Sequence, residues 1–139
     1  MDWKSVAIIG AVIAAGAGYY VWQGSQPVPT KSGVPIAQVK VPNALPAAAK
    51  NGAVAYQTFC ATCHGPNAAG QEGVAPPLVH KIYEPSHHGD VAFLLAAQRG
   101  VTAHHWRFGN MPPVADVTEA EVADIVAYIR ALQRANGIE

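Results

Sequence analysis

The 139-residue sequence is poor in charge and in cysteine. Only 13% of its residues are charged, and 9 Lys and Arg balance 9 Asp and Glu, so the charge gives no reason to expect nucleic-acid binding. Two cysteines cannot supply the two cysteine pairs of a common structural zinc site. Because both fall in one short motif, no cysteine is left for a disulfide framework. A domain this small needs another means of stabilisation, and a covalently held cofactor is one.

The two cysteines lie in the segment Cys60-Ala61-Thr62-Cys63-His64, which has the C-x-x-C-H pattern of covalent c-type haem attachment. On a helix, thiols three residues apart lie on adjacent turns, where each can form a thioether with one haem vinyl group. His64 then supplies a ligand to the iron. A C-x-x-C pair also occurs in thioredoxin-like enzymes, but no βαβ pattern surrounds this one. Zinc bound by Cys60, Cys63 and distant histidines is a further alternative.

The N-terminal part contains a long apolar run. Residues 5–22 carry no charge and follow Lys4, and aromatic residues gather at the far end of the run. As a helix this stretch would measure about 27 Å, close to the thickness of bilayer hydrocarbon. We predict that residues 1–22 form a single transmembrane anchor with Lys4 inside. The alternative is a signal peptide, cleaved at the small residues Ala15-Gly16-Ala17.

Residues 23–48 contain five prolines and show no helical or strand period. This composition favours extended polyproline II structure, which would reach roughly 80 Å at about 3.1 Å per residue. We predict a flexible linker here. The alternative is a segment that wraps around the surface of the following domain.

Residues 49–139 predict an all-α domain. Apolar spacing indicates a helix over roughly Ala48–Cys60 and another over Asp90–Arg99, which Gly100 should end. Thr118 and Glu121 form a capping box ahead of the clearest apolar period in the chain, and Gly137 lies where that last helix should stop. Long Pro- and Gly-containing segments lie between these helices, and loops of this length are unusual in a compact domain. They are consistent with one if they wrap around a haem.

The iron needs a second axial ligand, and Met111 is the leading candidate. It lies in a proline-flanked loop just before the last helix, and the only other methionine is Met1. A methionine thioether stabilises ferrous haem, whereas a lone methionine can also simply fill a core. Five histidines compete with it, His105 foremost; they are His80, His87, His88, His104 and His105. A copper or other metal site at His104 and His105 is a weaker alternative, because adjacent side chains should point apart.

With these residues in place, the stretch from Lys50 to Leu132 resembles the monohaem class I cytochrome c family, and specifically its membrane-anchored bacterial members. The matching positions are Gly52, Tyr56, Cys60, Cys63, His64, Pro76, Leu78, Met111 and Tyr128. The resemblance implies a class I cytochrome c fold of three or more helices around one haem c. It implies thioethers at Cys60 and Cys63, with His64 and Met111 as the two iron ligands.

The same resemblance assigns supporting roles. It implies that Gly52 and Tyr56 pack against Tyr128 of the last helix. It implies that the Pro76 carbonyl accepts a hydrogen bond from Nδ1 of His64, which would fix the imidazole tautomer. Leu78 matches a buried leucine of the family.

The resemblance implies an electron-transfer protein rather than an enzyme. The expected donor is a quinol-oxidising complex or dehydrogenase, and the expected acceptor is a terminal oxidase or reductase. The expected location is the bacterial cytoplasmic membrane, with the haem domain in the periplasm. One alternative is a dedicated haem subunit of a membrane-bound dehydrogenase or oxidase. Another is a ligand-binding haem sensor or peroxidase, which requires an absent or displaced Met111.

Overall fold

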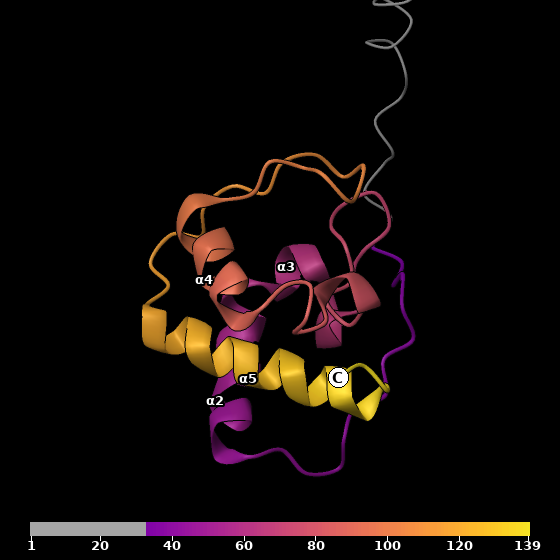
Figure 1. The fold of residues 1–139 in the computed structure, drawn as a ribbon, viewed down its shortest axis with the longest axis vertical. Helices are drawn as coiled ribbons and strands as arrows, with labels where there is room; N and C mark the ends of the chain where they lie inside the picture. The colour runs from indigo at the N-terminus through magenta and orange to yellow at the C-terminus, as the bar shows by residue number, and fades with distance from the viewer. Residues whose placement is uncertain (1–32) are drawn as a thin grey trace, which may run out of the picture. The chain divides into compact units, whose positions relative to one another are not determined.

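The computed structural model describes residues 33–139, so the predicted anchor over 1–22 and the first part of the predicted linker lie outside it. The described chain is all-α (Figure 1). Its helices are α2 (Ala47–Phe59), α3 (Ala61–His64), α4 (Asp90–Arg99) and α5 (Glu119–Ala135), with 3₁₀ turns η1 (Pro66–Ala68) and η2 (Lys81–Tyr83). Over residues 33–139, none of the helices has the length and apolar character needed to cross a membrane.

The helix ends follow the local signals in the sequence. Thr118 Oγ1 accepts a hydrogen bond from the backbone N–H of Glu121 at 3.2 Å, and Glu121 accepts one from the Thr118 N–H at 2.8 Å. This capping box starts α5 as predicted. The bonds that the Thr118 N–H and hydroxyl donate to the Glu121 carboxylate, at 2.8 and 2.7 Å, hold the pKa of that carboxyl below its usual value. Gly100, with φ of 73°, ends α4 at the predicted residue.

The main core forms where α2 crosses α5, which lies in front of it in Figure 1. The crossing is so close that a Cβ on Gly52 would lie 1.8 Å from the Asp124 carbonyl oxygen, so only glycine fits there. Next to it, the rings of Tyr56 and Tyr128 pack with their centroids 5.6 Å apart. The predicted packing of Gly52 and Tyr56 against the last helix is therefore confirmed.

A buried arginine ties three segments together. Arg130 of α5 is 7% exposed and donates hydrogen bonds to the carbonyl oxygens of Tyr83 and His88, both at 2.6 Å. It also pairs with Asp90, the first residue of α4, at 2.9 Å, and its guanidinium lies over the Phe93 ring. The segment before α4 is thereby fixed to α5.

The described part of the predicted linker is not a free tether. Ile36 and Ala37 donate backbone hydrogen bonds to the Ala69 carbonyl at 3.2 and 2.9 Å, and Asn136 pairs with the backbone of Lys40 in both directions at 2.9 Å. Val39 and Leu45 pack against the main core. Proline-rich chain without a period can still satisfy its backbone groups against a neighbouring surface. From Ile36 onward this proline-rich segment therefore packs against the surface of the domain, as in the alternative interpretation of the sequence.

Candidate functional site

The C-x-x-C-H motif lies at the junction of α2 and α3. Cys60 ends α2 with φ of −118° and ψ of −33°, and its carbonyl accepts the backbone N–H of His64 at 2.9 Å. The chain thus turns helically through the motif, and Cys60 and Cys63 lie on successive turns. Both are free thiols, the first half-buried and the second exposed.

The Cys60 thiol is not set up as a nucleophile. Burial, with a smaller effect from the neighbouring Cys63, raises its pKa to about 11. Reactive cysteines in thioredoxin-like motifs instead have lowered pKa values, which keep them as thiolates near neutral pH. This opposes the alternative of a dithiol redox enzyme.

His64 is oriented by a backbone carbonyl. Its Nδ1–H donates a hydrogen bond to Pro76 O at 2.8 Å, as the sequence predicts. With Nδ1 as the donor, Nε2 carries the free lone pair. Burial lowers the pKa of His64, although the bond to Pro76 opposes this, so the imidazole is neutral at pH 7. A neutral imidazole whose other nitrogen is tied to a carbonyl is the usual form of a histidine metal ligand.

The loop after the motif locks it in place. The side-chain amide of Gln71 donates to the carbonyls of Thr62 and Cys63 at 2.8 and 3.0 Å, and so satisfies the C-terminal end of α3. The Tyr56 hydroxyl donates to Gly65 O at 2.8 Å. Sequence reasoning missed Gln71, because a single amide in a loop gives no signal of the carbonyls that it meets.

Leu78 is buried at 8% exposure and belongs to the main core, as predicted. Its backbone N–H donates to Ala68 O at 2.9 Å, and its carbonyl accepts from the buried amide of Gln133 at 2.9 Å. These bonds connect the loop that carries Pro76 to α5.

Met111 is held by a different part of the domain. Its backbone forms a reciprocal pair of hydrogen bonds with Val101, both 2.9 Å, at the base of the loop between α4 and α5. A Cβ on Gly100 would lie 2.4 Å from Met111 O, so glycine also allows this approach. In the view of Figure 1, α3 lies between this loop and α5. The bonds that fix Met111 thus run to the end of α4, whereas those that fix His64 run to the Pro76 loop.

The residues present fit a covalently attached haem. Two accessible thiols on successive turns precede a neutral histidine with a free Nε2. A zinc site at the cysteines lacks support, because the group of potential metal ligands gathered within residues 33–139 is His87, His88 and His105 instead. Burial raises the pKa of Tyr83, and the nearby Trp106 side chain opposes that rise. Within the described residues, the indole N–H of Trp106 is buried and has no hydrogen-bond partner. Such a donor suits an acceptor on a bound group.

The predicted geometry of His104 and His105 is wrong. Their ring centroids lie only 4.3 Å apart, and both rings approach His88. The loop between α4 and α5 bends at these residues, so neighbouring side chains do not diverge as they would on an extended chain.

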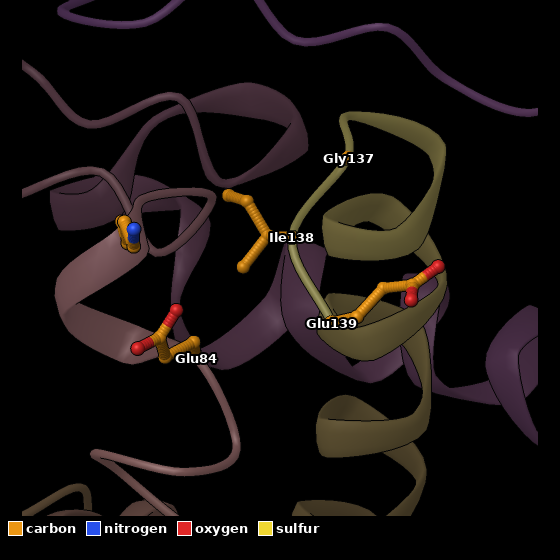
Figure 2. A pocket seen from close by; sticks show the side chains of 5 residues that line it. Glu84, Gly137, Ile138 and Glu139 are labelled. Carbon is orange, nitrogen blue, oxygen red and sulfur yellow. The ribbon is translucent and has the colours of Figure 1, made fainter.

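A shallow hollow lies at the C-terminal end of α5, beside η2 (Figure 2). Its lining is formed by Lys81, Glu84, Gly137, Ile138 and Glu139. It includes none of the predicted haem-binding residues.

Comparison with known proteins agrees with this site. Residues 49–133, more than half of the chain, match the family model for cytochrome c. No curated protein and no solved structure matches the chain. The fold and the motif define a haem-binding electron-transfer domain, and the chain belongs to the cytochrome c family. Membership implies covalent haem c and haem-based electron transfer.

Proposed function

We propose that the protein is a one-electron carrier with a single haem c, attached through Cys60 and Cys63 and ligated by His64 and Met111. The haem supplies the one-electron Fe(III)/Fe(II) couple. The observation that carries the proposal is the His64 Nδ1–Pro76 O bond of 2.8 Å directly after the two thiols. It fixes the ring orientation and leaves Nε2 for the iron.

Met111 completes the coordination in this proposal. Support comes from the backbone pairing with Val101 and from its partial burial, which limit how far the thioether can move. A thioether ligand favours the ferrous state and so raises the reduction potential. Since both axial positions are then taken by the protein, no position remains for substrate, and electron transfer is favoured over a sensor or peroxidase.

The experiment is spectroscopy of the purified full-length protein. We expect haem to stay with the polypeptide on acid-acetone extraction and the ferric form to show the weak long-wavelength band of a methionine–iron bond. Cys60→Ser or Cys63→Ser should each leave one thioether and shift the α-band of the reduced form, and the double variant should lose covalent haem. Extractable haem in the wild type would refute the attachment.

We propose also that residues 1–22 anchor the domain to the bacterial cytoplasmic membrane, with the haem on the periplasmic side. The uncharged run over 5–22 supports this. The expected partners are membrane-bound: a quinol-oxidising complex or dehydrogenase as donor, and a terminal oxidase or reductase as acceptor. Carbonate extraction followed by N-terminal sequencing tests the anchor, because a cleaved signal would release a protein that starts near Gly18.

One observation favours the alternative, a dedicated haem subunit of a larger complex. Because Ile36 and Ala37 already bond to the Ala69 carbonyl of the domain, the free linker is shorter than residues 23–48, and its reach falls below the roughly 80 Å expected at about 3.1 Å per residue. A short linker restricts the haem to partner sites close to the membrane. Purification in mild detergent separates the two functions, since a subunit co-purifies stoichiometrically with its partners and a carrier does not.

A further inference from the structure

Four histidines from two separate loops meet on the surface of the domain. His87 and His88 lie in the turn before α4, and His104 and His105 lie in the loop between α4 and α5. The ring of His105 lies 5.3 Å from each of His87 and His88, measured between centroids. One ring nitrogen of each of these three residues lies within 4.8 Å of the other two. We call these three residues the histidine cluster.

The separation of one pair of nitrogens suits a tetrahedral metal ion. Nε2 of His87 and Nε2 of His105 are 3.3 Å apart. Zinc–nitrogen bonds are about 2.0–2.1 Å long, so two ligands of a tetrahedral ion lie roughly 3.3–3.4 Å from each other. At this distance the two nitrogens also form a hydrogen bond with each other, which a bound ion would replace.

Backbone carbonyls orient the rings. Nδ1 of His88 donates to Ile82 O at 2.7 Å, which leaves Nε2 of His88 with its lone pair free. Nδ1 of His104 donates to Thr102 O at 2.8 Å, with the same result. A carbonyl bond on one nitrogen and a free lone pair on the other is the arrangement found in histidines that bind metals. The Ile82 contact is kept in place because Arg130 binds the adjoining carbonyls of Tyr83 and His88.

Desolvation and the nearby imidazoles of His104, His88 and His87 lower the pKa of His105.

We propose that the histidine cluster binds one divalent transition-metal ion of the Zn²⁺ class, through one ring nitrogen each of His87, His88 and His105. His104 or water would complete the coordination. Imidazole donors with no thiolate suit zinc, copper and nickel rather than calcium or magnesium. The bound ion would link the turn before α4 to the loop between α4 and α5, which also carries Met111. It would thereby restrict the movement of that loop.

The test is calorimetric titration of the full-length, haem-loaded protein with Zn²⁺, chosen because it does not exchange electrons with haem. We expect one saturable equivalent. His87→Asn and His105→Asn should each weaken binding at least tenfold. The matched control is His80→Asn, since His80 lies outside the cluster and asparagine can still accept the Ile82 N–H that His80 Nδ1 accepts at 3.2 Å. This variant should bind Zn²⁺ like the wild type.

Hydrogen exchange gives the second measurement. Zn²⁺ should slow amide exchange in residues 101–111 of the wild type, and it should not do so in His105→Asn. The absence of saturable binding, or equal binding by wild type and both cluster variants, would overturn the proposal. The proposed function is tested separately, because His105→Asn should keep the methionine–iron band. Absence of that band in the wild type, together with a changed haem spectrum in His105→Asn, would instead make His105 an iron ligand and would overturn both.

Discussion

Replacing Arg130 by methionine should destabilise the domain by about 2–6 kcal/mol. Methionine keeps the apolar stem of the side chain but ends level with the arginine Nε, so it lacks the guanidinium that lies over Phe93. The loss comes from hydrogen-bond acceptors that are left unpaired. His88 O and Gln133 Oε1, each bonded to the guanidinium at 2.6 Å, would lose their donor, whereas Tyr83 O keeps the amide of Gln133 at 2.9 Å. Each orphaned acceptor away from water costs about 1–3 kcal/mol.

The matched control is Asp90→Asn. The Asp90 side chain is 69% exposed, so water screens its charge and asparagine can still accept the Arg130 bond. An exposed ion pair contributes at most about 1 kcal/mol. Denaturant unfolding of the two haem-loaded variants, compared at equal m-value, measures the difference. If Asp90→Asn costs as much as Arg130→Met, the carbonyl contacts are not what holds this region, and the reasoning is refuted.

Three further predictions follow. Met111→Ala should remove the methionine–iron band, let ferrous haem bind carbon monoxide and lower the reduction potential; an unchanged spectrum would contradict the assignment. Gly52→Ala should lower the free energy of unfolding, measured in urea, by at least about 1–3 kcal/mol, because α2 must move away from α5. Gly89→Ala should be tolerated, because its added Cβ would lie 3.7 Å from the nearest atom. The lowered pKa of Glu121 means that the capping box stabilises the fold above the unfolded pKa of about 4.5 and loses this effect as pH falls through the lower folded value. The difference in unfolding free energy between the wild type and Thr118→Ala should therefore be largest above about pH 4.5 and decrease as the pH falls, and a difference that does not change with pH would argue against it.

Local signals in the sequence determined the helices and the attachment motif. The capping box at Thr118, the stop at Gly100 and the C-x-x-C-H segment each involve residues within a few positions of one another, so their geometry follows from short-range backbone chemistry. The glycine and tyrosine of α2 and the Pro76 carbonyl agreed with the structure because the family resemblance supplied their long-range partners.

The tertiary structure alone decided the contacts between distant segments. Lys40 and Asn136 pair across 96 residues, and Arg130 reaches Asp90 across 40. Such contacts depend on how the whole chain closes, and neither partner carries a local pattern that names the other. For the same reason, the sequence predicted a flexible linker where the described part of the proline-rich segment packs against the domain. The sequence suggested a metal site at His104 and His105 alone, because only the packing of two loops brings His87, His88 and His105 together.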